Sequence, residues 1–137
     1  MCPVVKKKEP LLSHVDRAGQ ARMVDIGAKP KTDRMAWAQA CVTMQPETLN
    51  AIRDGAIAKG AVIGTARLAG VMAAKRTSEL VPLCHPIEIV EVEIEFAERG
   101  DSKLEISSRV RAFDRTGAEM EALMAAMPIV FLVVSPL

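Results

Sequence analysis

The fold is decided by residues 90–112, which read VEVEIEFAERGDSKLEISSRVRA. Apolar residues occupy the even positions from 90 to 96, and glutamates occupy the odd positions from 91 to 95. This alternation predicts a strand with one apolar and one charged face. A turn is expected at residues 98–102, after which the apolar face continues through Leu104, Ile106, Val110 and Ala112. The stretch is therefore a predicted antiparallel hairpin.

Charge indicates the register of this hairpin. The register that pairs Val92 with Val110 also sets a glutamate against each arginine, Glu93 against Arg109 and Glu91 against Arg111. Opposite charges across a strand pair contribute about 0.2–1 kcal/mol each, which favours this register over one that opposes two glutamates. Ile87 and Ile89 have the opposite phase from Val90. A β-bulge is therefore expected near residues 89–90.

Further strands are expected upstream. Residues 36–44 carry apolar side chains at the even positions, with Trp37, Gln39, Cys41 and Thr43 between them, and predict a strand. Residues 21–28 predict a shorter strand with weaker alternation, and residues 29–34 a polar loop that opens with Pro30. Residues 1–20 are expected to form a flexible arm with a run of lysines at 6–8 and a turn at residues 16–19.

Helices are expected between and after these strands. Pro46 suits the first turn of a helix that ends near Gly55, because its missing N–H costs nothing there. A second helix is expected over residues 61–80, with Pro82 beyond its end. Its apolar stripe would contain Val62, Ala66, Ala69, Ala73 and Leu80, and Gly64 and Gly70 would permit close packing on a sheet.

The last predicted helix starts after Arg115. Thr116 followed by Glu119 fits a capping box, in which each side chain bonds the other residue's backbone N–H. Because strands and helices are segregated, we expect an α+β fold, with an antiparallel sheet covered by helices on one face. Residues 21–127 would form a single domain, and residues 128–137 an atypical apolar tail whose β-branched run is an aggregation hazard if exposed.

Composition excludes several classes of protein. The 137 residues include 18 basic and 17 acidic side chains, a balance that argues against a general nucleic-acid binder. Cys2, Cys41 and Cys84 are far apart, so we expect neither a disulfide framework nor a zinc or other metal site, and a reducing cytoplasm fits best. No apolar run approaches the roughly 20 residues that a membrane helix needs, and no secretory signal is apparent. A soluble, cytoplasmic protein is expected.

The segment from Val81 to Pro86 is the strongest candidate for chemistry. Pro82 and Pro86 would stiffen the loop and hold Cys84 and His85 between them. His85 could bind phosphate or transfer protons, or it could only orient the loop through local hydrogen bonds. Cys84 could be a nucleophile, but a small buried residue fits better, because the only adjacent base is His85.

Two charged groups are further candidates. The first is cationic and contains Arg34, Lys59, Arg67, Lys75 and Arg76. Lys59 and Gly60 precede a predicted helix, where backbone amides favour anions, although an ordinary solvated lysine is the alternative. The second is Glu119-Met120-Glu121. Residues two apart on a helix diverge by roughly 200°, so Glu119 could cap the helix while Glu121 reaches a site, or both could be structural and solvent-facing.

These segments occur in an order typical of one family. They include MVDI at 23–26, CVTM at 41–44, TARLAG at 65–70, AAKRT at 73–77, LVPLCHP at 80–86 and TGAEMEAL at 116–123. Over about residues 13–127 the chain resembles cyclic pyranopterin monophosphate synthase, the molybdenum cofactor biosynthesis protein C family. The PLCHP and TGxEMEAL signatures together are highly specific for it.

The resemblance implies a ferredoxin-like domain, assembled from dimers into a homohexamer, with the site at a dimer interface. It implies a lyase that converts cyclised dihydroguanosine triphosphate to cyclic pyranopterin monophosphate and releases pyrophosphate, with no cofactor. Lys59, His85 and Glu121 would be catalytic. The substrate-binding residues would be Arg34, Leu83, Cys84, His85, Glu119, Met120 and Glu121.

One part of the family pattern has no counterpart here. The family's principal acid–base pair, Asp-x-x-Lys, follows the last helix, whereas no Asp or Lys lies beyond Glu121 in this sequence, as in a truncated or altered C-terminus. Two hypotheses are therefore open: a working lyase, or a catalytically impaired member that binds the nucleotide or pterin or only co-assembles with full-length subunits. A structural domain without a ligand is disfavoured by the PLCHP loop and the charged groups.

Overall fold

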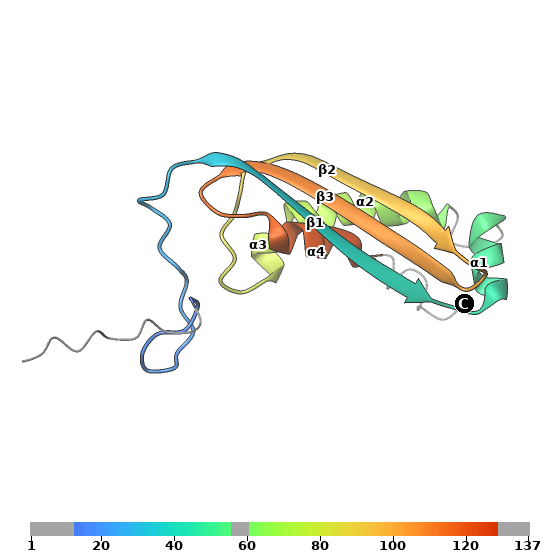
Figure 1. Cartoon of the computed structure of the whole chain (residues 1–137), viewed down its shortest axis with the longest axis horizontal. Helices are drawn as coiled ribbons and strands as arrows, with labels where there is room; N and C mark the ends of the chain where they lie inside the picture. The colour runs from blue at the N-terminus through green and yellow to red at the C-terminus, as the bar shows by residue number, and fades with distance from the viewer. Residues whose placement is uncertain (1–12, 56–60, 129–137) are drawn as a thin grey trace, which may run out of the picture.

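The computed structural model describes residues 13–55 and 61–128. The elements in these ranges are β1 (Thr32–Thr43), α1 (Pro46–Arg53), α2 (Val62–Lys75), α3 (Thr77–Leu80), β2 (Ile89–Arg99), β3 (Lys103–Asp114) and α4 (Glu119–Ala126). The strands form an antiparallel sheet in the order β1-β3-β2, and α2 and α4 lie together across one face (Figure 1). The α+β prediction is confirmed, and the arrangement is ferredoxin-like.

The hairpin of β2 and β3 has the predicted register. Val92 pairs with Val110, and the two glutamate–arginine pairs follow as expected. A shift in register between Ile89 and Glu91 confirms the bulge. Val90 does not continue the apolar face, because the bulge leaves it 56% exposed. The turn is shorter than predicted, since β2 continues to Arg99 and β3 begins at Lys103.

The ion pairs on the hairpin differ in part from the strand pairing. Arg109 Nη2 lies 2.6 Å from Glu93 and 3.5 Å from Glu91. Arg111 instead donates to Asp33 of β1, with 2.9 Å between Nε and Oδ1. Because β3 is the central strand, its arginines can pair with acidic residues on both neighbouring strands.

β1 confirms the strand predicted at residues 36–44 but begins earlier, at Thr32. The end of the predicted polar loop at residues 29–34 is therefore in the sheet, where it pairs with the last residues of β3. The strand predicted at residues 21–28 is wrong, since only Ala21 forms a bridge, to Val15. A strand needs a partner, and here the Asp25 carboxylate accepts the Gly27 N–H in a local turn instead, at 2.8 Å.

The helix predicted at residues 61–80 is two helices. α2 ends at Lys75 and α3 begins at Thr77. The Thr77 hydroxyl donates to the carbonyls of Ala73 and Ala74, at 2.9 and 3.0 Å, and so offers the backbone an alternative to continuing the helix. The short helix α1 begins at Pro46, as predicted.

The apolar stripe of α2 follows a different path from the predicted one. Val62 and Ala66 are buried as expected, but the stripe continues through Gly70 and Ala74. Leu80 is 60% exposed, because the break before α3 changes the direction of the chain. Gly64, which was expected to allow close packing, is exposed instead, and a Cβ there would make only an ordinary contact with Ala61, at 3.8 Å.

Small side chains let α2 and α4 approach the sheet closely. A Cβ at Gly70 would lie 2.5 Å from the Ala125 carbonyl oxygen of α4 and would also meet Ile94 of β2. The buried Ser108 of β3 donates to the Ala122 carbonyl of α4 at 2.6 Å. This packing fixes the first turn of α4 beside the loop that follows α3.

Candidate active site

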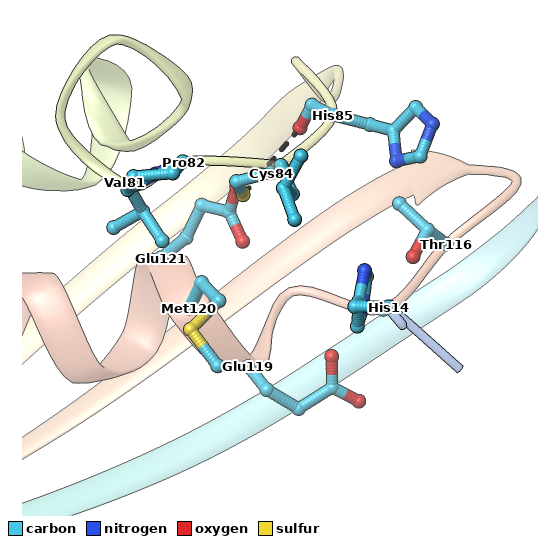
Figure 2. Close-up of a pocket in the computed structure, with 11 residues that line it drawn as sticks. His14, Val81, Pro82, Cys84, His85, Thr116, Glu119, Met120 and Glu121 are labelled. Carbon is cyan, nitrogen blue, oxygen red and sulfur yellow. Dashed lines mark hydrogen bonds between the residues drawn. The ribbon is translucent and has the colours of Figure 1, made fainter. Parts of the chain in front are cut away.

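A pocket of about 350 Å³ lies between the loop after α3 and the start of α4 (Figure 2). One wall is the loop from Val81 to His85, and the other runs from Thr116 into the first turn of α4. A residue from the N-terminal segment, His14, completes the lining. The full set is His14, Val81, Pro82, Leu83, Cys84, His85, Thr116, Gly117, Glu119, Met120 and Glu121. Two of the three candidate groups from the sequence, the loop after α3 and the Glu119–Glu121 segment, therefore form one site.

The loop wall is held in an unusual backbone conformation. Leu83 has a φ of +64°, in the left-handed region that non-glycine residues rarely adopt. Such a residue costs of order 1–3 kcal/mol and persists only where its surroundings fix it. The Cys84 N–H donates to the Val81 carbonyl at 3.3 Å and closes the turn. The backbone of the loop is therefore held by this hydrogen bond as well as by Pro82 and Pro86. The positive φ of Leu83 is a further constraint, which the sequence did not indicate.

The helix wall corrects the predicted capping box. α4 begins at Glu119, and its N-cap is Ala118, with no side-chain hydrogen bond at the cap. Ala118 is 1% exposed with a non-helical backbone, so its packing in the core delays the start of the helix. Thr116 lines the pocket instead of capping the helix. The Glu119 carboxylate lies against Gly117, where a side chain would collide with it.

This late start also changes the geometry of the two carboxyl groups. Glu119 is the first helical residue, so its side chain is free to fold back along the preceding segment. Glu121 is two residues into the helix and points inward. Both side chains therefore line the same pocket, an arrangement that residues two apart could not reach from the middle of a helix.

The buried Glu121 and the partly buried Cys84 lie together in the site. Glu121 is 2% exposed, and the Cys84 Sγ lies 3.7 Å from its Oε1 (Figure 2). Burial raises the pKa of Glu121 above its ordinary value of 4.5, while hydrogen bonds from its own backbone N–H and from Cys84 oppose this shift. Burial and the nearby Glu121 raise the pKa of the Cys84 thiol. A raised pKa reduces the thiolate population, so this environment favours a thiol donor over a nucleophile.

The ends of the pocket differ in chemistry. Figure 2 shows His85, Thr116 and His14 towards one side of the view. Cys84, Glu121 and Met120 lie towards the other. One end can donate hydrogen bonds from imidazole and hydroxyl groups, and the other combines a buried carboxyl with apolar surface. The pocket can therefore orient a small molecule by polar contacts at one end and by apolar contacts at the other.

The remaining predicted site residues lie elsewhere. Arg34 is in β1 and does not line the pocket, although its Nε is buried without a hydrogen-bond partner among the described residues. Lys59 lies outside the described residues. Arg67 donates to the Ile94 carbonyl at 3.2 Å and lies 5.5 Å from the centroid of Phe96, which indicates a structural role. Lys75 lines a separate cavity of about 40 Å³ behind Glu121.

Sequence reasoning missed His14 as a site residue. No spacing or motif in the sequence connects this histidine with the segment that contains His85. In the described part of the chain, no three His, Cys, Asp or Glu residues gather in a way that could hold a metal ion. Across residues 13–55 and 61–128, no helix is long and apolar enough to cross a membrane.

The fold and the pocket define an α+β domain built to hold a small polar molecule. Comparison with known proteins gives its family. The MoaC family model matches residues 23–134. A protein of Thermomicrobium roseum named cyclic pyranopterin monophosphate synthase is 53% identical over 115 residues, which are 83% of this chain and 69% of that protein.

Two further relatives carry the same name. The protein of Herpetosiphon aurantiacus is 55% identical over 117 residues, 85% of this chain and 71% of its own length. That of Brucella ovis is 53% identical over 116 residues, 84% of this chain and 70% of its own length. The chain belongs to the MoaC family.

Proposed function

We propose that this chain is a lyase of molybdenum cofactor biosynthesis. It converts cyclised dihydroguanosine triphosphate to cyclic pyranopterin monophosphate and releases pyrophosphate. The observation that carries the proposal is the single pocket formed by the PLCHP loop and the first turn of α4. The relatives named cyclic pyranopterin monophosphate synthase share more than half of their aligned residues with this chain, and the family match includes both walls.

The polarity of the pocket supports one orientation of the substrate. The triphosphate lies at the end that contains His85, where an imidazole N–H can donate to phosphate oxygens. Lys59 and Arg34 bind the same phosphates in the assembled protein, with the site at a dimer interface as the family resemblance implies, since Arg34 does not line this pocket within one chain. The ring system lies against Leu83, Cys84 and Met120 at the opposite end. There Glu121 accepts a hydrogen bond from an N–H group of the ring, and Glu119 reaches the ring from the side of the pocket that His14 borders.

Proton transfer falls to groups in the pocket that can gain and lose a proton. Glu121 is the best placed, because its burial raises the pKa of its carboxyl and lets it hold a proton at a higher pH than an exposed glutamate. His85 is the proposed proton-transfer group at the phosphate end, because its imidazole lines that part of the pocket. Cys84 keeps its proton and donates towards Glu121, which holds that carboxyl in position.

We also propose that the chain works in the cytoplasm as a homohexamer that is assembled from dimers. The sheet face opposite the helices supports an assembly, because it exposes large apolar side chains among its ion pairs. Trp37 is 69% exposed, Phe113 46% and Met35 44%. A second subunit covering this face would remove them from water, with a gain of roughly 25 cal/mol per Å² of apolar surface.

Equilibrium binding tests the proposal. Each protein carries Glu121→Gln, which slows turnover during the titration. Isothermal titration with cyclised dihydroguanosine triphosphate should then give saturable binding that weakens at least tenfold when His85→Ala or Lys59→Ala is added, since a hydrogen bond to a charged group is worth about 1.5–3 kcal/mol. Lys29→Ala, at an exposed lysine outside the pocket, is the matched control and should bind normally. Equal affinity in all four proteins would refute the proposed phosphate site.

A further inference from the structure

Residues 13–22 reach the pocket in a defined conformation. The Asp16 Oδ1 accepts the backbone N–H groups of Ala18 and Gln20, at 2.8 and 2.9 Å. Val15 bridges to Ala21, and the His14 carbonyl accepts the Arg22 N–H at 2.9 Å. Side-chain bonds of this kind stabilise tight turns. Together these hydrogen bonds join the two arms of the turn and fix the backbone position of His14.

This placement brings the His14 side chain to the pocket wall. His14 is exposed to solvent, and it lines the pocket together with Thr116 and Glu119. Figure 2 shows the His14 ring near Thr116, on the same side of the view as His85 and across from the PLCHP loop. Two imidazoles from distant parts of the chain therefore border the same end of the pocket.

The charges of the lining residues indicate what the two histidines contribute to binding. The described residues that line the pocket include two carboxyl groups, Glu119 and Glu121, and no lysine or arginine. A polyanion is repelled by such a site unless nearby donors offset the carboxylates. His14 and His85 are the lining side chains, among those described, that can carry positive charge or donate from a ring N–H.

We propose that His14 is a substrate-binding residue that donates to a phosphate oxygen from the wall opposite His85. The inference rests on the proposed function for the identity of the substrate, and it adds the N-terminal segment to the site. The two imidazoles hold the phosphate chain between them. His14 also separates those phosphates from the nearby Glu119 carboxylate.

The test measures dissociation constants by isothermal titration for two ligands, inorganic tripolyphosphate and cyclised dihydroguanosine triphosphate. Every protein compared, including the one called wild type at position 14, carries Glu121→Gln so that the nucleotide is not turned over during the titration. His14→Ala should weaken both by about tenfold, the loss expected for a hydrogen bond to a charged group. His14→Gln, which keeps a side-chain N–H, should recover part of that loss. Arg17→Ala removes a full positive charge from the same exposed turn but lies outside the pocket lining, and should change either affinity by less than about twofold.

The outcomes separate this inference from the proposed function. If wild type and His14→Ala bind the nucleotide equally, or if Arg17→Ala loses as much affinity as His14→Ala, the inference is overturned and the proposed function stands. If tripolyphosphate binds in a His14-dependent way and the nucleotide does not bind, the anion site is supported and the proposed substrate is wrong. If wild type binds neither ligand, both are overturned.

Discussion

Gly70 should be the most demanding position in the packing of α2 on α4. A Cβ built there lies 2.5 Å from the Ala125 carbonyl oxygen, which is backbone and cannot rotate away, and also meets the Ile94 side chain. Overpacking of this kind costs about 1–3 kcal/mol, whereas replacing a helical glycine by alanine gains about 0.5–1 kcal/mol. Gly70→Ala should therefore lower the free energy of unfolding by up to about 2.5 kcal/mol.

Gly64 supplies a matched control on the same helix. It is exposed, and a Cβ there would have its nearest contact at 3.8 Å, with Ala61. Gly64→Ala should keep only the helix-propensity gain and raise stability by about 0.5–1 kcal/mol. Urea unfolding followed by circular dichroism measures both, with the slope on denaturant unchanged. If Gly70→Ala proves as stable as Gly64→Ala, the close approach of α2 and α4 is wrong.

Three further predictions concern the site and the assembly. Gly117→Ala should push the Glu119 carboxylate out of its position, and so weaken nucleotide binding as much as Glu119→Gln does. The unfolding midpoint should stay unchanged. Normal binding by Gly117→Ala would contradict the placement of Glu119. Burial raises the pKa of Glu121 in the folded state, so the ionised carboxyl costs stability above its ordinary pKa of 4.5 and the cost disappears as pH falls below that value. Glu121→Gln should therefore gain stability relative to wild type between pH 4 and pH 7, and a difference that does not vary with pH would exclude a carboxyl with a raised pKa. Trp37, the chain's single tryptophan, should show a blue shift of its emission as protein concentration rises through assembly, whereas Trp37→Glu should leave a folded protein that sediments as a smaller species.

The hairpin was predictable because its information is local. Strict alternation and charges of opposite sign in residues 90–112 determine both the faces and the register, and these are the features that the structure shows. The strand predicted at residues 21–28 failed for the opposite reason, since alternation does not say whether a neighbouring strand is available. The break between α2 and α3 depends on one hydroxyl, that of Thr77, which an apolar stripe cannot reveal.

The site was predictable where motifs carried it. The loop containing Cys84 and His85 and the segment containing Glu119 and Glu121 were both identified from sequence, and the structure places them on one pocket. The capping box was wrong because the burial of Ala118, a tertiary effect, sets where α4 begins. His14 could not be predicted, because its position depends on how the N-terminal segment runs across the folded domain.

A single-turnover assay is the most direct way to test whether this chain converts cyclised dihydroguanosine triphosphate to cyclic pyranopterin monophosphate. Purified protein in excess over cyclised dihydroguanosine triphosphate should release one equivalent of pyrophosphate per substrate, with a matching amount of fluorescent pterin after oxidation of the product. Wild type should complete this turnover, and Glu121→Gln should bind substrate yet release pyrophosphate much more slowly. Tight substrate binding by wild type without any pyrophosphate would contradict the account and leave a protein that binds the nucleotide but does not transform it.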